Sequence, residues 1–518
     1  MLRLRSSTFR PSLLTGVTLL ILFLVISSWI AVSDVNDLYW HVRMGEDILA
    51  HHRLTGDPLW TFGPVGDQKW VTTQALSEVL MYGWWKALGW GGFALLRFIS
   101  GIIFLVILWK ANKTVIPMGF VRAGKDRVLL LITLITLFFI SGTIQERPQT
   151  VTFILFVPFA VILLRYLITG IWPNPVIVFF VVMVWSWFHG GAVLVGPLFA
   201  AAFGIRLIFI HILKIELPTA GYGNEGRWRW LLVLSAAMIA PLFNPIGINL
   251  YLQARKIQEA SVGYISEWEP VGITSFTFMG FSLLIVLWVY ATMVRLRKTE
   301  SWRIAALEGA WILMLLVFGM SSARMLVLSF LLMIPVATRR LSQIWNPKPS
   351  RLAKYVKPKY EKGFYIVVAL IFILPIVPLF FNNTGIPNDS PVRIMSGLAN
   401  QDTPSGRKAI IAWNINGQFE AFGGAHLSTF LDGRTDRYGS KVIDDYSTLI
   451  KGADGWEKIW STYPETTDVV LEKDDGLISL LLLKGWRTAC VQDKFVWVTK
   501  PGYKGECSDV IPATTGVK

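Results

Sequence analysis

The chain has 518 residues, of which 53% are hydrophobic and only 16% are charged, and its mean hydropathy is +0.51. Such a composition excludes an ordinary soluble enzyme and describes a chain that lies mostly in lipid. The net charge of +15 does not indicate a nucleic-acid partner, because the Lys and Arg of a polytopic protein collect in cytoplasmic loops.

Apolar runs long enough to cross a hydrocarbon core of roughly 30 Å recur along the first three-quarters of the chain and predict about eleven spans. The expected spans are 13–33, 91–109, 128–144, 150–168, 174–188, 191–212, 230–246, 275–294, 304–320, 325–340 and 364–381. Arg3, Arg5 and Arg10 precede the first run, so a signal peptide is the alternative to an uncleaved anchor. The length of the run favours the anchor.

Lys and Arg alternate between loops in a way that sets the topology. Most of them fall in one set of loops, 3–10, 110–127, 214–229, 295–303 and 339–362. The positive-inside rule therefore predicts a cytoplasmic N-terminus. An odd number of spans then places the tail outside the cytoplasm.

The tail, 383–518, has the composition of a small extracytoplasmic α/β domain. "KAIIAWN" and "TDVVLEK" predict strands, "DGLISLLLLK" a helix and "WRTACVQDKFVWVTK" a pair of strands. "NINGQFEAFGG" is interpreted as a Gly-bearing turn, and "FLDGRTDRYG" as a turn held by local hydrogen bonds and ion pairs, with binding of an acceptor glycan as the alternative. Cys490 and Cys507 both fall in this domain, and we expect a disulfide between them, with two reduced buried thiols as the alternative. The predicted fold class is thus a mainly α polytopic bundle, 1–382, followed by this domain.

The first extracytoplasmic loop, 34–90, belongs to the predicted bundle and contains an amphipathic helix. Leu76, Val79, Leu80, Trp84 and Leu88 repeat there at helical spacing. The helix is expected to lie along the outer membrane surface, and a packed lid helix is the alternative.

Polar residues at the ends of the spans gather on the predicted outer side. They are Asp34, Asp37, His41 and Arg43 after the first span, Gln145, Glu146 and Arg147 between the third and fourth, His189, Asn244, Glu267, Glu269 and Arg324. Such groups are expensive in lipid and often mark function, although any single one could be a cap or an anchor. Six segments that deliver charges to one side predict a shared cavity.

The motifs "NDLYWHVRMGEDIL", "GDPLWTF", "KWVTTQALSEVL", "ERPQ", "WFHGG", "NPIG", "EWEP", "SSARM" and "LDGRTDRYG" carry a resemblance over nearly the whole chain. The chain resembles a bacterial family of largely uncharacterised polytopic membrane proteins. That family is similar to the GT-C type glycosyltransferases, which include the protein mannosyltransferases and aminoarabinose transferases. The resemblance implies transfer of a sugar from a polyprenyl-phosphate donor to an extracytoplasmic acceptor in the bacterial plasma membrane, with an acidic residue of the first outer loop in the reaction.

Carried over, this acidic residue is Asp37, with Asp34 as its partner. A carboxylate can act as the general base for an acceptor hydroxyl. Gln74 stands where relatives tend to carry an acid, so the need for a metal, or any divalent cation as a cofactor, is left open.

The remaining candidates are assigned to substrate binding. Arg147, Arg324 and His189 suit the charge that gathers on a departing phosphate, and Lys69 could help. Glu267 and Glu269 could bind sugar hydroxyls, with His41, Arg43 and Glu146 nearby in sequence. Trp40, Trp70 and Trp268 offer faces for a sugar, but the tryptophan belt of the membrane interface is the commoner explanation.

The expected partners are the lipid-linked donor, membrane lipids and an acceptor that is an envelope glycan, lipid or protein. A transporter or flippase of a lipid-linked precursor is the competing function. It predicts polar groups on both leaflets or near the midplane, and inverted repeats, and the sequence shows neither. A non-catalytic envelope scaffold is the third.

Overall fold

The computed structural model describes residues 36–54, 61–64, 70–116, 122–217, 228–297, 302–345, 390–401, 406–423 and 426–509. The chain divides into two compact units that alternate along the sequence. The helical unit comprises Met1–Val32, Gly91–Tyr251 and Ile265–Asn383, and the mixed unit comprises Ser33–Trp90, Leu252–Tyr264 and Thr384–Lys518. The mixed unit thus groups the first loop with the tail, and the domain bounds 1–382 and 383–518 stay a prediction.

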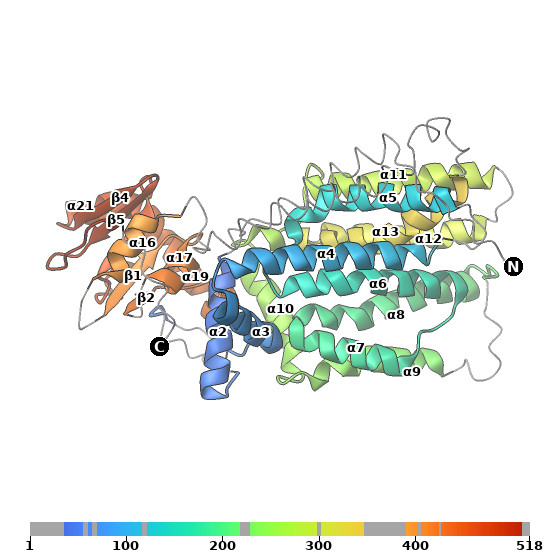
Figure 1. The fold of residues 1–518 in the computed structure, drawn as a ribbon, viewed down its shortest axis with the longest axis horizontal. Helices are drawn as coiled ribbons and strands as arrows, with labels where there is room; N and C mark the ends of the chain where they lie inside the picture. Colours follow the sequence, from blue (N-terminus) through green and yellow to red (C-terminus); the bar gives the residue numbers. More distant parts are fainter. Residues whose placement is uncertain are drawn as a thin grey trace, which may run out of the picture. The chain divides into compact units, whose positions relative to one another are not determined.

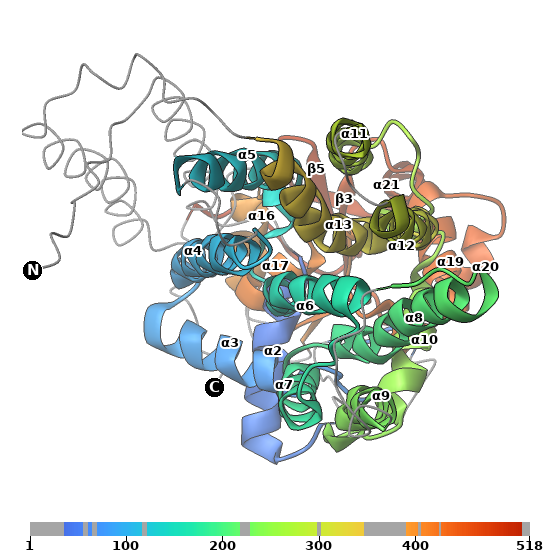
Figure 2. The same ribbon diagram turned by 90° about the vertical axis from the view of Figure 1, so that its right-hand side faces the viewer.

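Nine α-helices of the described residues build the helical unit. They are α4 (Gly92–Lys113), α5 (Arg122–Ile140), α6 (Gln149–Thr169), α7 (Pro175–Phe188), α8 (Val195–Leu207), α9 (Arg229–Ile239), α11 (Phe276–Leu296), α12 (Trp302–Met320) and α13 (Ala323–Ile344). Figure 1 shows α4, α5, α6, α11 and α13 running alongside one another, and Figure 2 looks along them. Almost every residue of α13 between Leu326 and Ser342 is buried, so this helix forms the centre of the bundle.

Four short 3-10 helices and one π-helical segment, η3, lie between these helices in the described residues. They are η1 (Ser141–Thr143), η2 (Gly190–Leu194), η3 (Ile208–Ile212), η5 (Ala240–Phe243) and η6 (Ser266–Trp268). α10 (Asn249–Ser261) crosses the boundary between the units. Side chains cap several helix starts: Ser275 Oγ accepts from the Phe278 amide before α11, and Ser322 Oγ accepts from the Met325 amide before α13, each at 3.2 Å.

Among the described residues, six helices are long and apolar enough to cross a membrane. They are α4, α6, the run Gly190–Ile212 that contains α8, α11, α12 and α13. Three apolar helices, Arg127–Thr143, Pro175–Phe188 and Arg229–Phe243, are shorter. The protein is therefore a multi-pass membrane protein. The expected spans 13–33 and 364–381 lie outside the described residues, and the total of eleven stays a prediction.

The mixed unit contains a five-stranded sheet with the order β2-β1-β3-β5-β4. Its strands are β1 (Arg407–Ile411), β2 (Leu427–Thr429), β3 (Asp468–Glu472), β4 (Arg487–Gln492) and β5 (Phe495–Thr499). β1 runs parallel to β2 and β3, whereas β5 runs antiparallel to β3 and β4. The four predicted strands are thus present.

Helices of the mixed unit come from both ends of the chain. They are α2 (Asp37–His51), α3 (Ala75–Leu88), α16 (Val392–Ala399), α17 (Asn416–Phe422), α18 (Thr435–Tyr438), α19 (Ser440–Lys451), α20 (Trp456–Trp460) and α21 (Gly476–Leu483). The turn predicted in "NINGQFEAFGG" is wrong, because this segment forms α17. Gly417 serves close packing there: a Cβ at this position would clash with the Asn36 carbonyl oxygen.

The first loop is joined directly to the sheet. Thr61 forms a parallel bridge with Thr429 of the edge strand β2. The Phe62 amide donates to the Thr429 carbonyl at 2.9 Å, and the Gly63 amide donates to the Phe430 carbonyl at 2.8 Å. These bonds satisfy backbone groups of an edge that would otherwise be open.

Two further features of the mixed unit bear on the sequence analysis. Cys490 and Cys507 form a disulfide with a Cα–Cα distance of 5.1 Å. The predicted helix of the first loop is α3, which buries Glu78 and Met81 and exposes Leu80 and Leu88. Its placement on a membrane surface stays a prediction.

Candidate functional site

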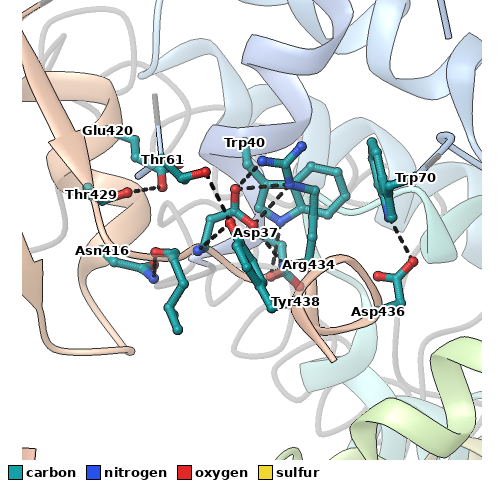
Figure 3. Close-up of polar contacts among 12 residues, drawn as sticks. Asp37, Trp40, Thr61, Trp70, Asn416, Glu420, Thr429, Arg434, Asp436 and Tyr438 are labelled. Carbon is teal, nitrogen blue, oxygen red and sulfur yellow. Dashed lines mark hydrogen bonds and ion pairs between the residues drawn. The ribbon is translucent and has the colours of Figure 1, made fainter. Parts of the chain in front are cut away.

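Asp37 begins α2 and lies against the turn that follows β2. Its Oδ1 accepts a hydrogen bond from Trp40 Nε1 at 3.3 Å, and its side chain is half-buried. Figure 3 shows Asp37 and Trp40 beside Arg434 of the turn. A Cβ on Gly433 would clash with Asp37 Oδ1, so the absence of a side chain there lets the backbone approach the carboxylate. The structure therefore brings together Asp37 and the "FLDGRTDRYG" segment.

A buried ion pair holds this turn. Arg434 Nε donates to both carboxylate oxygens of Asp432 at 2.9 Å, and Arg434 Nη2 donates to Oδ2. Burial alone would raise the pKa of Asp432, but the charge and hydrogen bonds of Arg434 hold this pKa below its usual range. The pair therefore stays ionised and fixes the shape of the turn, as the sequence analysis expected.

Arg434 also covers two tryptophan rings. Its guanidinium lies 4.9 Å from the ring centre of Trp70 and 5.7 Å from that of Trp40. Only 7% of Trp40 and 5% of Trp70 is exposed. These rings therefore have little surface on which a sugar could rest, and their indole N–H groups donate to Asp37 and Asp436.

Asp436 is the second carboxyl of the turn, and it is half-buried. Its Oδ2 accepts from Trp70 Nε1 at 2.7 Å and from Gln253 Nε2, so it joins the first loop, α10 and the tail. Burial raises the pKa of Asp436. Nothing local in the sequence marks Gln253, because its partner lies 183 positions away.

Glu420, on α17, is a further buried carboxyl that the sequence analysis missed. Thr429 Oγ1 donates to Glu420 Oε1 at 2.8 Å, and 4% of Glu420 is exposed. Burial, with a contribution from the charge of Asp432, raises the pKa of Glu420 to about 8. Arg43 interacts electrostatically with Glu420, and burial lowers the pKa of Arg43. Arg43 is therefore part of the internal charge balance of the mixed unit.

His41 is also internal. Its Nδ1 lies 3.3 Å from Glu78 Oε1 and 3.4 Å from Gln74 Nε2, and 3% of the residue is exposed. Thr72 Oγ1 donates to the other oxygen of Glu78 at 2.7 Å. These contacts join α2 to α3, which favours a structural role for His41. Asp34 and Lys69 lie outside the described residues.

In the helical unit, three predicted residues form what we call the Glu267 cluster. Arg147 Nη1 donates to Glu267 Oε1 at 3.0 Å, and Arg324 Nη2 donates to Glu267 Oε2 at 2.7 Å. The side chains are partly exposed, by 17% for Arg147, 22% for Arg324 and 38% for Glu267. Burial would raise the pKa of Glu267, but Arg324 and Arg147 together lower it. Glu267 is thus an ionised counter-ion for two arginines.

The other predicted residues of the helical unit lie near helix ends. His189 Nδ1 lies 2.8 Å from Thr152 Oγ1 and accepts from the Gly191 amide at 3.0 Å, which caps η2. Glu146 is 2% exposed and interacts with Arg97. Glu269 is exposed, and its carbonyl accepts from the Ala323 amide at 3.2 Å. The structure therefore gives His189 and Glu146 internal partners.

A second ion cluster in the helical unit was not predicted. Glu308 accepts from Arg339 Nη1 at 2.6 Å, from Arg340 Nε and from Trp288 Nε1 at 2.8 Å. The side chains of Glu308 and Arg340 are 0% exposed. Arg339 falls in the predicted loop 339–362, but α13 continues to Ile344, so both arginines lie within the helix.

Within the described ranges, no group of three or more His, Cys, Asp or Glu side chains is placed to hold a metal ion.

The geometry defines a multi-pass helical membrane protein with a mixed α/β unit, in which three predicted site residues meet in the Glu267 cluster. One solved structure, ArnT from Cupriavidus metallidurans bound to undecaprenyl phosphate, is similar over 94% of this chain and 97% of that chain, with 11% sequence identity and a TM-score of 0.47. At that score the similarity transfers neither a site nor an activity. No family model matches the chain, and no curated protein matches it.

Proposed function

We propose that this protein is a membrane glycosyltransferase that moves a sugar from a polyprenyl-phosphate donor to an acceptor outside the cytoplasm. The observation that carries the proposal is the Glu267 cluster, where two guanidinium groups converge on one partly exposed carboxylate. The three side chains have a net charge of +1, from two arginines and one glutamate. Such a site at the ends of membrane helices suits an anionic lipid headgroup.

The arginines are held in a way that suits phosphate. Arg324 lies 4.4 Å above the ring centre of Trp268, which restricts its guanidinium plane. Arg147 lies directly before α6, and its carbonyl accepts from the Thr150 amide at 3.0 Å. A preorganised pair of cations would stabilise the negative charge that gathers on the phosphate when the sugar leaves.

Asp37 is the proposed general base for the acceptor hydroxyl. Its carboxylate is half-buried and oriented by Trp40 Nε1. A positioned base contributes roughly 100- to 10,000-fold to the rate. Asp34 as its partner and Lys69 as a helper at the phosphate stay predictions.

The alternative, a transporter or flippase, has one observation in its favour. Glu308, Arg339 and Arg340 form a second charge cluster in the helical unit, which we call the Glu308 cluster. None of these residues belongs to the predicted outer set. The Glu308 carboxylate is 0% exposed and accepts from three donors, which is how a structural ion pair is built. The transferase is therefore the better-supported function.

The decisive experiment incubates the purified full chain in nanodiscs with a panel of polyprenyl-phosphate sugars and follows release or transfer of the sugar. We expect Asp37→Asn to lower turnover at least about a hundredfold with donor binding kept. Arg324→Ala should weaken both donor binding and turnover. Arg303→Ala is the matched control, because Arg303 pairs with the exposed Glu216 at 3.1 Å elsewhere in the same unit. Normal transfer by a folded Asp37→Asn variant would contradict the role of Asp37, and translocation without transfer would support the flippase.

A further inference from the structure

Glu267 occupies the position between two arginines that a lipid phosphate would take. Both of its oxygens are used, one by Arg147 and the other by Arg324. Carboxylates and phosphates accept the same planar pattern of guanidinium donors. The phosphate of a bound lipid and the side chain of Glu267 therefore compete for the same hydrogen bonds.

Hydrogen bonds hold the backbone next to Glu267, so the side chain of Glu267 is the part that must move when a phosphate binds the arginines. The Ala323 amide donates to the Glu269 carbonyl at 3.2 Å, and the Val271 amide donates to the Met320 carbonyl at 3.4 Å. Trp268, the neighbour of Glu267, is 9% exposed beneath Arg324. Glu267 itself is 38% exposed, so its carboxylate can turn into water when another anion arrives.

We propose that Glu267 is a built-in competing anion that matches the arginine pair to the singly charged phosphodiester of the donor and promotes release of the doubly charged phosphomonoester product. This inference rests on the proposed function. It gives Glu267 a role different from the sugar-hydroxyl ligand that the sequence suggested.

The charge change in the reaction makes this discrimination useful. In the transfer, the acceptor oxygen bonds to the anomeric carbon, the bond from that carbon to the phosphate oxygen breaks, and the acceptor proton passes to the base. A phosphodiester with one negative charge thereby becomes a phosphomonoester with a charge of about −1.5 to −2 at neutral pH. Two arginines without a counter-ion would bind this product more tightly than the donor.

With Glu267 in place, the cluster has a charge of +1, which one phosphodiester neutralises. The arginines lower the pKa of Glu267 against the effect of its burial, so the side chain is ionised at neutral pH and competes throughout turnover. Replacement of Glu267 by a neutral isostere should therefore favour the dianion over the monoanion.

The test measures binding of two short lipids to the full chain in detergent: farnesyl phosphate, which is a phosphomonoester, and its methyl ester, which is a singly charged phosphodiester. We expect the Glu267→Gln variant to bind farnesyl phosphate about tenfold more tightly than the wild type does. The variant lacks the charged carboxylate that competes with the phosphate for hydrogen bonds from the two arginines at this partly exposed site. The affinity for the methyl ester should rise by a clearly smaller factor. In turnover assays, the same variant should be inhibited by the phosphomonoester at correspondingly lower concentration.

Glu216→Gln is the matched control, because it removes the same charge at an exposed position of the same unit, where Glu216 pairs with Arg303. It should change both affinities by a similar small factor. Glu267→Ala is a second variant with the same expected preference, in case the amide disturbs the loop.

Failure of this inference can be distinguished from failure of the proposed function. If folded Glu267→Gln and Glu267→Ala leave the ratio of the two affinities at its wild-type value, the inference is wrong and the phosphate site stands. If Arg147→Ala and Arg324→Ala bind both lipids as well as the wild type does, the phosphate site of the proposed function fails.

Discussion

Gly433→Ala is the perturbation that tests how the tail of the chain acts on Asp37. The added Cβ would clash with Asp37 Oδ1 and would lie 3.1 Å from Trp40 Nε1 and 3.5 Å from Trp40 Cδ1. The backbone at Gly433 has no positive φ, so alanine is compatible with its conformation and the clash alone is tested.

The expected effect follows from the size of the clash. Relief requires the Asp37 carboxylate or the turn to move by about an ångström, and overpacking of this kind costs about 1–3 kcal/mol of stability. A misplacement of about 1 Å can lower the rate of a positioned reaction about a hundredfold. We therefore expect turnover to fall about a hundredfold with little change in donor binding, because the arginines of the Glu267 cluster are untouched.

The assay is turnover and donor binding of Gly433→Ala, of Asp37→Asn and of the double variant. If the alanine acts through Asp37, the double variant should be no slower than Asp37→Asn alone. Gly83→Ala is the control, because no atom lies within 4 Å of a Cβ at that helical position of the same unit. Multiplying defects in the double variant, or full activity in Gly433→Ala, would refute the reasoning.

Three further predictions concern stability. Cys490→Ser should lower the free energy of unfolding by about 3 kcal/mol on the chain-entropy model, and mass spectrometry without reductant should find both thiols blocked in the wild type. Glu308→Gln leaves the buried Arg340 without its anion and should cost about 3–5 kcal/mol, seen as a lower melting temperature in detergent. The raised pKa of Glu420, about 8 in the fold, means that its contribution to stability is complete below the unfolded pKa and is lost as the pH rises through 8. Urea unfolding at pH 5, 6.5 and 8 should therefore show a loss of stability with rising pH that Glu420→Gln reduces; an equal loss in both proteins would contradict this.

The sequence predicted those parts of the fold that depend on local patterns. Long apolar runs became the helices of the bundle, and β-branched runs bounded by turn residues became strands β1, β3, β4 and β5. The failure at α17 has a physical cause. Gly417 was interpreted as a turn signal, but it is glycine because the Asn36 carbonyl lies against it, a contact between positions about 380 residues apart that no local pattern encodes.

The site residues also divide into those that a local sequence pattern marks and those that only long-range contacts reveal. Asp37 stood out in the sequence because a carboxylate directly after an apolar run is costly unless it has a role. Glu420 and Gln253 gave no such signal, since polar residues in polar segments are ordinary. Only the folded chain buries Glu420 near Asp432 and brings Gln253 to Asp436. For Trp40 and Trp70, the sequence favoured the membrane-interface belt and left a face for a sugar as the alternative. The structure places the Arg434 guanidinium over both rings.

The two ion clusters of the helical unit show which feature separates a structural charge group from one that can exchange its anion. Each consists of one glutamate between two arginines, and Arg147 and Arg339 are equally exposed at 17%. The difference lies in the carboxylates: Glu308 is 0% exposed and Glu267 is 38% exposed. A carboxylate that cannot reach water cannot give its place to another anion, because its own desolvation would then be uncompensated. Neutralising Glu308 should therefore destabilise the fold, whereas neutralising Glu267 should tighten binding of a lipid phosphate, and the same substitution at two similar clusters distinguishes stability from function.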